Sequence, residues 1–314
     1  MSIKIKLEEN RSVTLEELVD QLESIQFDPT DQKSLITAAP LLKSLANNPS
    51  FLGDYVIEQL EQDFSNVSLD NNYVPQVILL KLDQRKGYII RANFWPAVDD
   101  SVYKSSGASA FSYGLAHDHN FNFLTVGYFG PGYMTDIYEY DYDSVSGYSG
   151  EKVDMVYCGQ EYLSTGDVML YRAHRDIHIQ HPPSSMSISL NLMESSRKAS
   201  LTNQYEFDIS SSTIKTILNE NRLQALISSA ALLEPEGCRQ ILKDIADKHP
   251  NDRVKFEAIK VRACSSQDYA SSLEILEKGA CSESRMVRES CRQYRTHLEQ
   301  NPLRIGSKSN ELLI

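Results

Sequence analysis

A series of short strand-like segments between two helical regions is the feature that most restricts how this chain can fold. Residues 71–210 contain many runs rich in β-branched and aromatic residues, such as VPQVILLKL and GYIIRANFWPA, and clusters of glycine, proline and serine separate them. Strands that are this short and this regularly interrupted predict an antiparallel sandwich or barrel. We therefore expect an α+β protein with helical extensions before and after a β-domain.

Apolar residues recur at helical spacing in the N-terminal region, residues 1–70. The run VTLEELVDQLESI predicts a helix with Thr14 as its N-cap and Glu17 as the capping-box partner. A second helical run contains Pro40 in its middle, which predicts a kink or a break at that point.

Residues 211–300 return to helical spacing, and residues 301–314 are expected to form a loose tail. Val254-Lys255 recurs as Val287-Arg288 at an offset of 33 residues, a pattern that is faintly similar to HEAT-type helical repeats. An ordinary helical bundle is the competing interpretation.

The composition argues against several classes of function. There are 43 acidic and 31 basic residues, giving a net charge of -12, whereas a nucleic-acid-binding protein needs a clustered basic face. No apolar run predicts a signal peptide or a membrane span. The five cysteines lack any C-x-x-C pair, as is typical of reduced thiols. We expect a cytoplasmic protein that binds neither nucleic acid nor membranes.

The stretch AHDHNFNF contains the residues that bear most directly on function. Alternate residues of a strand point to the same face, so His117 and His119 are predicted to project together while Asp118 points away. Two imidazoles that share a barrel interior are hard to protonate, and a divalent metal accepts their neutral nitrogens. An exposed strand whose polar alternation continues through Asn120 and Asn122 is the competing interpretation; the apolar flanking segments favour the metal site.

A third histidine follows in GDVMLYRAHRDIHIQHPP, where a turn at Gly166-Asp167 precedes a strand and then His178. This arrangement resembles the cupin superfamily, whose first motif carries H-x-H and whose second begins at a Gly-Asp turn and ends in a histidine. The resemblance covers about residues 73–195. It implies an antiparallel double-stranded β-helix, the cupin jelly-roll barrel, with His117, His119 and His178 as metal ligands.

The sequence departs from the family pattern at the fourth ligand. Phe123 stands where the family's glutamate is expected, and the nearest carboxylates are Asp136 and Glu139. These two have opposite parity along a strand, so at most one of them faces inward. Either one of them completes the site, with Glu139 as the preferred candidate, or the site is of the three-histidine type.

The resemblance implies a mononuclear divalent metal, with iron(II) favoured and zinc, nickel and manganese left open. It also implies a dioxygenase-like oxidoreductase that acts with dioxygen on a small metabolite or an amino-acid-derived substrate. Two alternatives stay open: a non-oxygenase cupin, either an isomerase or a small-molecule-binding protein, and an interaction scaffold that uses the C-terminal helices. A homodimer is a further expectation.

Other polar and aromatic residues near the predicted site are candidates for catalysis, for substrate binding and for orienting the metal ligands. An arginine can hold a substrate carboxylate, a tyrosine can supply a proton, and a carboxylate or imidazole can orient a metal-bound histidine. Aromatic packing and surface ion pairs are the competing interpretations. The candidates are Tyr138 and Arg172 as catalytic residues, Arg91 and Trp95 as substrate-binding residues, and Asp118 and His174 as residues that support the ligands.

Overall fold

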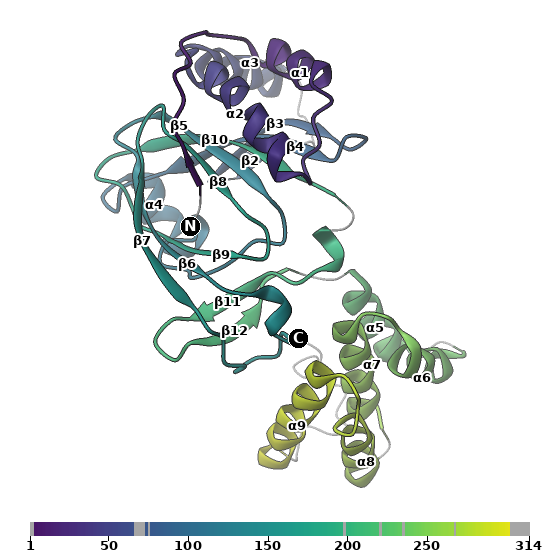
Figure 1. The fold of residues 1–314 in the computed structure, drawn as a ribbon. Helices are drawn as coiled ribbons and strands as arrows, with labels where there is room; N and C mark the ends of the chain where they lie inside the picture. The colour runs from purple at the N-terminus through teal and green to yellow at the C-terminus, as the bar shows by residue number, and fades with distance from the viewer. Residues whose placement is uncertain are drawn as a thin grey trace. The chain divides into compact units, whose positions relative to one another are not determined.

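The computed structural model describes residues 3–65, 73–74, 76–196, 199–219, 222–233, 236–266 and 268–301 (Figure 1). The chain divides into two compact units. The first consists of Met1–Tyr142 with Asp154–Ile209, and the second of Asp143–Val153 with Ser210–Ile314. Most of the predicted β-domain lies in the first unit together with the N-terminal helices, whereas residues 143–153 belong to the second.

A large antiparallel sheet forms the centre of the first unit. Its strands are β1 (Ile3–Ile5), β2 (Tyr73–Val74), β3 (Val77–Asp83), β4 (Tyr88–Trp95), β5 (Phe123–Phe129), β8 (Val168–Tyr171) and β10 (Ser187–Glu194). They are hydrogen-bonded in the order β1-β8-β5-β10-β4-β3-β2. Neighbours along the sheet are often far apart in sequence, as expected of a jelly roll rather than a meander.

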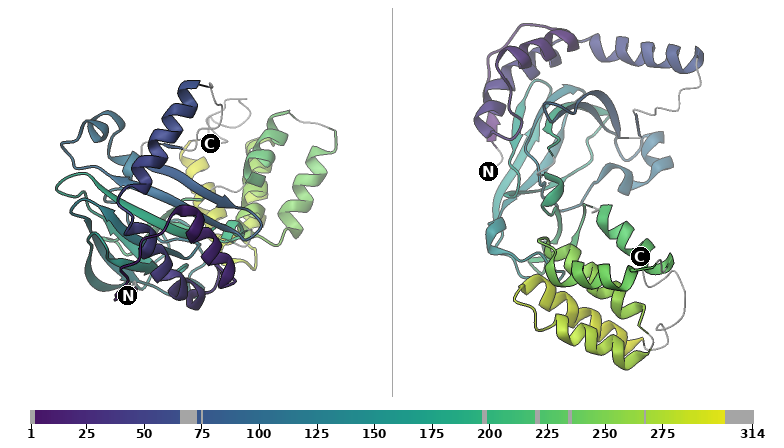
Figure 2. Two further views of the ribbon diagram at one scale, coloured as in Figure 1. Left: turned by 90° about the horizontal axis from the view of Figure 1, so that it is seen from above. Right: turned by 90° about the vertical axis from the view of Figure 1, so that its right-hand side faces the viewer.

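One face of this sheet packs against three helices, α1 (Leu15–Ser24), α2 (Gln32–Ala46) and α3 (Phe51–Ser65) (Figures 1 and 2). The predicted capping box at Thr14 and Glu17 begins α1. Pro40 lies inside a continuous α2, so the predicted break is wrong. The proline removes one backbone hydrogen bond, whereas the helix buries five apolar side chains along its length: Leu35, Ala38, Ala39, Leu42 and Leu45.

A smaller sheet faces the other side of the large one. It contains β6 (Tyr133–Glu139), β7 (Val156–Leu163) and β9 (Asp176–Gln180) in the order β7-β6-β9. His117 extends this sheet by one further position, because it bridges β9 at His178 and β11 (Tyr205–Asp208) at Glu206. The two facing sheets confirm the predicted α+β jelly-roll core with helical extensions.

The alternation of side chains along the large sheet separates two environments. On β4 and β10, Ile90, Ala92, Leu190 and Leu192 face the helices. The intervening residues face the space between the sheets, where an aromatic-rich cluster forms from Trp95, Phe123, Tyr133, Ile137, Leu163, Met169, Tyr171 and Met193. This second environment contains the predicted metal ligands.

Shorter elements complete the first unit: α4 (Ser101–Ser106) and two 3-10 turns at Ala108–Phe111 and Ala199–Leu201. A further 3-10 turn spans Tyr142–Ser144. None of the helices in the described ranges is long and apolar enough to cross a membrane.

The second unit is mainly helical. It contains β12 (Thr213–Ile217), α5 (Arg222–Leu233), α6 (Cys238–Lys248), α7 (Asp252–Cys264), α8 (Tyr269–Gly279) and α9 (Arg285–Gln300). Helix α7 contacts α5, α6, α8 and α9 and so forms the centre of the bundle. Asn251 caps α7 and Ser284 caps α9 three residues before the valine of each repeated pair. The HEAT-like relationship itself stays a prediction.

Candidate metal centre

His117 and His178 are direct cross-strand neighbours. The amide of His178 donates to the carbonyl of His117 at 2.9 Å, and the amide of His117 donates back at 3.2 Å. Directly opposed residues of an antiparallel pair project to the same face, so both imidazoles enter the space between the sheets. Their ring centroids lie 4.3 Å apart, and both residues are buried.

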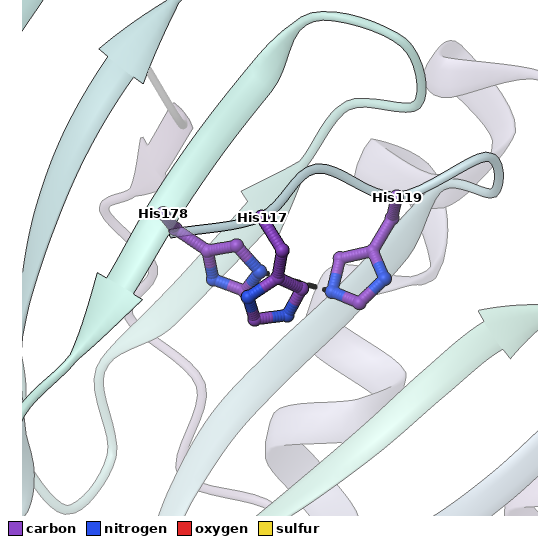
Figure 3. Close-up of side chains that lie close together, drawn as sticks. All are labelled: His117, His119 and His178. Carbon is purple, nitrogen blue, oxygen red and sulfur yellow. Dashed lines mark hydrogen bonds between the residues drawn. The ribbon is translucent and has the colours of Figure 1, made fainter. Parts of the chain in front are cut away.

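His119 reaches the same point from irregular backbone, because β5 begins only at Phe123. The expectation that His117 and His119 lie on one regular strand is therefore wrong. The carbonyl of His119 accepts the amide of His174 at 2.8 Å, which fixes the backbone as it leaves the small sheet. Figure 3 shows the three rings converging, with His119 Nε2 and His178 Nε2 2.9 Å apart.

The three ligand atoms lie within 4.8 Å of one another, and within the described ranges this is the one group of three or more His, Cys, Asp or Glu side chains with that property. Sequence reasoning named all three residues. The grouping supports metal binding, because imidazole nitrogens at such distances repel unless a proton or a cation lies between them.

The outer nitrogen of each ring has a partner that sequence reasoning missed. His117 Nδ1 donates to the carbonyl of Leu115 at 2.9 Å, which leaves its Nε2 lone pair free. His178 Nδ1 contacts the side-chain amide of Gln180 at 2.5 Å, and His119 Nδ1 contacts that of Gln204 at 3.3 Å. Partners at Nδ1 orient metal-binding imidazoles and select their tautomer.

The site favours neutral imidazoles. Burial is the main cause that lowers the pKa of each histidine below its usual value. The charge of His117 lowers the pKa of His119 further, and both lower that of His178. Neutral nitrogen is the form that coordinates a metal, so burial that penalises protonation also prepares the ligands.

Aromatic rings surround the histidines in place of a carboxylate. The Phe123 ring lies 5.0 Å from the ring of His119 and stacks on Tyr171 at 4.7 Å, with an interplanar angle of 8°. Tyr171 in turn lies 4.7 Å from His178. The position where the family pattern places a glutamate therefore contributes an apolar wall.

Glu139 does not join the three histidines. Its carboxylate receives Arg172 at 2.8 Å through Oε1 and Arg175 at 2.8 Å through Oε2. Arg172 also binds Asp176, so this predicted catalytic arginine belongs to an ion-pair network at the end of β6 and β9. Two arginines satisfy both oxygens of Glu139 and hold them away from the histidines.

Asp136 and Tyr138 lie on the opposite face of β6 from Ile137, the residue that pairs with His178. Asp136 accepts from His181 at 2.7 Å, and the ring of Tyr138 packs 5.0 Å from that of Tyr157. The structure therefore places the predicted catalytic tyrosine away from the histidines, as the alternation of side chains along a strand requires.

Asp118 points away from the two flanking imidazoles, as predicted. Its carboxylate accepts the Tyr140 hydroxyl at 2.6 Å and the Tyr205 amide at 2.6 Å. Burial raises the pKa of Asp118 to about 7, against these two hydrogen bonds. Asp118 thus anchors the backbone between the ligands. His174 adopts φ 57° and packs its ring 4.1 Å from that of Tyr142.

Arg91 and Trp95, the predicted substrate-binding residues, lie on β4 and face the space between the sheets. The Trp95 indole donates to Ser189 Oγ at 2.9 Å, and its ring lies 4.4 Å from that of Tyr133. Arg91 Nε is buried and has no hydrogen-bond partner among the residues that the structure describes. Arg91 is also close enough to His119 to lower the pKa of that imidazole.

No family model matches the sequence, and no curated protein matches it. Similar solved structures include a cupin-like protein from Thermotoga maritima (9% identity, 42% of this chain, 74% of that chain, TM-score 0.22). A DMSP lyase from Ruegeria pomeroyi (10%, 43%, 54%, 0.23) and hydroquinone 1,2-dioxygenase solved with Cd²⁺ (11%, 40%, 68%, 0.23) are also similar. At these identities and TM-scores nothing about activity follows. Likenesses this weak carry no conclusion about the family of this chain either.

Proposed function

We propose that this protein is a metal-dependent oxidoreductase of the oxygenase type, with one divalent metal, iron(II) by preference, held by His117, His119 and His178. The observation that supports this function is the convergence of three imidazoles, two of them buried and that of His119 partly buried, with no carboxylate of the described residues among them. The substrate is a small molecule that enters the space between the two sheets.

Three nitrogen ligands leave several positions of a six-coordinate metal open. Iron(II) with adjacent open positions supplies the chemistry for bringing a substrate and dioxygen together. Imidazole alone does not select the metal, since zinc, nickel and copper accept it as well. The preference for iron rests on the open positions and on the cupin resemblance.

The residues of the chain have defined roles in this proposal. Leu115, Gln180 and Gln204 orient the imidazoles through their Nδ1 atoms. Phe123 and Tyr171 cover the histidines with apolar surface and keep bulk water from the open positions.

Metal analysis of the purified protein, followed by reconstitution with iron(II), tests the proposal before any substrate is known. We expect one equivalent of metal, loss of binding in His117→Ala and His178→Ala, and unchanged binding in the matched control His249→Ala, whose ring hydrogen-bonds to the backbone of Asn251 in the second unit. Nitric oxide, a probe for dioxygen, should bind the iron(II) protein and give a half-integer-spin paramagnetic signal.

Two results would contradict the proposal at different points. Absence of stoichiometric metal, or binding that survives both histidine substitutions, would remove the metal site. A bound metal that takes up no nitric oxide and supports no oxygen consumption would leave the site but favour a Lewis-acid role, as in an isomerase, over an oxygenase.

A further inference from the structure

A polar stripe crosses the inner face of the large sheet beside the histidines. Arg91 of β4 is paired directly with Asn191 of β10, which is paired in turn with Thr125 of β5. Asn93 lies two residues beyond Arg91 on the same face and is paired with Ser189. These five residues alternate with the apolar residues that face the helices, so they all face the space between the sheets.

Four atoms of this stripe are buried and have no hydrogen-bond partner in the described part of the chain: Arg91 Nε, Asn93 Oδ1, Thr125 Oγ1 and Asn191 Oδ1. Asn93 and Asn191 are only 4% and 3% exposed. Buried polar groups are nearly always paired in folded proteins, because each unpaired one destabilises the fold. Four such atoms on neighbouring positions of three strands indicate groups that bind a ligand.

The charge around the stripe determines the sign of that ligand. Arg91 keeps its positive charge at neutral pH, since burial lowers its pKa only to about 10. The metal is also positive, and the three imidazoles leave its charge uncompensated. The metal and the Arg91 guanidinium would then be two positive charges close together in a buried space. This arrangement is unfavourable until an anion binds between them.

The buried carboxylates of this unit do not supply that anion. Asp118 is held by Tyr140 and the Tyr205 amide, and Asp176 by Arg172. Glu194 accepts from the hydroxyl of Ser196 at 2.5 Å and from the backbone amide of Asn122 at 3.3 Å.

We propose that Arg91, Asn93 and Asn191 form a subsite for the carboxylate of a small hydroxy or amino acid, whose hydroxyl or amino group hydrogen-bonds to the asparagine side chains. The guanidinium binds the carboxylate, and the asparagine oxygens accept hydrogen bonds from the neighbouring donor group. The substrate's position beside a metal rests on the proposed function. Binding of the acid to the stripe does not depend on it and is measurable without turnover.

Trp95 is the only tryptophan of the chain and lies on the same face of β4 as Arg91 and Asn93. Its fluorescence therefore reports binding at the stripe. The probes are glycolate, L-lactate, glycine and L-serine, each compared with the alcohol or amine that lacks its carboxylate, and inorganic phosphate serves as a second anion. The titrations use the zinc-loaded full chain, in which no oxygen chemistry occurs.

We expect a saturable fluorescence change with at least one acid and none with its neutral analogue. Arg91→Gln should weaken that acid by roughly 10- to 100-fold, the range for losing a hydrogen bond between charged groups. The matched control is Arg85→Gln, which changes an exposed arginine and should bind as the unsubstituted protein does.

Asn191→Asp gives an independent test, because it places a carboxylate directly opposite Arg91. An internal anion should raise the melting temperature of the protein and abolish binding of the acid. A structural role for Asn191 would lower the melting temperature instead.

The proposal is overturned if no acid saturates the signal, if phosphate alone does so, or if Arg91→Gln binds the acid unchanged. Oxygen consumption is not used in these measurements. Acid binding to a protein that consumes no oxygen would therefore refute only the proposed oxygenase function, and oxygen consumption without acid binding would refute only the subsite.

Discussion

Gln180 controls which nitrogen of His178 is available to a metal. Its side-chain nitrogen lies 2.5 Å from His178 Nδ1, and His178 Nε2 lies 2.9 Å from His119 Nε2. With Nδ1 as an acceptor, the neutral His178 carries its proton on Nε2 and donates it to His119. Metal binding needs Nε2 bare, so the proton must move to Nδ1 and the Gln180 amide must present its oxygen there.

We therefore predict that Gln180→Leu weakens metal binding and that Gln180→Glu strengthens it. Leucine offers no acceptor for the Nδ1 proton, whereas a carboxylate only accepts and fixes the metal-binding tautomer. Partners of this kind typically change metal affinity by about 10- to 100-fold, or roughly 1.4–2.8 kcal/mol. The metal-free stability should change little, because Gln180 Oε1 is buried without a partner in the described ranges, so its removal offsets part of the lost hydrogen bond.

Competition with a chromophoric chelator measures the zinc dissociation constant of each variant, and urea unfolding measures its metal-free stability. Gln160→Leu is the matched control, since this glutamine donates to Asp136 on the outer face, away from the histidines. Equal zinc affinity in Gln180→Leu and the unsubstituted protein would refute the tautomer argument, as would weaker binding in Gln180→Glu.

Three further predictions concern the fold and the site. Phe123→Glu should bind zinc more tightly, as calorimetry measures, and unchanged zinc affinity would contradict a ligand position at residue 123. Without metal the variant should be less stable by about 3 kcal/mol in urea unfolding, because the stack on Tyr171 is lost. Burial raises the pKa of Asp118 from 3.8 to about 7, so between these pH values the folded metal-free protein binds more protons than the unfolded chain, and this group's contribution to stability falls as pH rises. Asp118→Asn should therefore lose less stability than the unsubstituted protein between about pH 5 and pH 8. Parallel curves of unfolding free energy against pH for the two proteins would contradict this. Leu190→Ala removes a fully buried side chain from the helix-facing side of β10 and should lower the free energy of unfolding in urea by about 2–5 kcal/mol. The control Leu201→Ala changes an exposed side chain and should leave that free energy nearly unchanged. A small effect at Leu190 would argue against the core between the sheet and the helices.

The sequence predicted the fold class and the meeting of the three histidines because both depend on local signals. Apolar alternation and turn residues mark the strands, and Gly166, with φ 83°, does form the turn before β8. The spacing between that turn and His178 identified His178 as the third candidate ligand. These signals operate over a few residues and need no knowledge of the tertiary partners.

The path of the chain between the first two ligands and β5 depends on partners far away in sequence. Asn120 and Asn122 alternate as they would on an exposed strand, yet both are buried. Asn120 donates to the carbonyl of Thr202 at 3.1 Å, and Asn122 accepts the amide of Ala173 at 2.9 Å. Their polar side chains thus anchor a crossing between the two sheets, which no local pattern distinguishes from a solvated strand.

The candidacy of Glu139 as a fourth ligand also depended on partners that are distant in sequence. A carboxylate near a metal site is a natural candidate ligand, but Arg172 and Arg175, more than 30 residues away, occupy both of its oxygens. Gln180, by contrast, carried a usable signal, because it lies two residues from His178 and shares its face of β9.

The bridge between His117 and His178 has a consequence for folding. The segment that carries His117 joins β9 through this bridge and through one further backbone bond, from the Gly114 amide to the Gln180 carbonyl at 3.0 Å. His119 and His178 are separated by 59 positions in sequence, so one ion bound to both would close that whole stretch into a loop. Such an ion would restrict the unfolded chain much as a cross-link does. Metal binding at the proposed site would then also stabilise the jelly roll against unfolding.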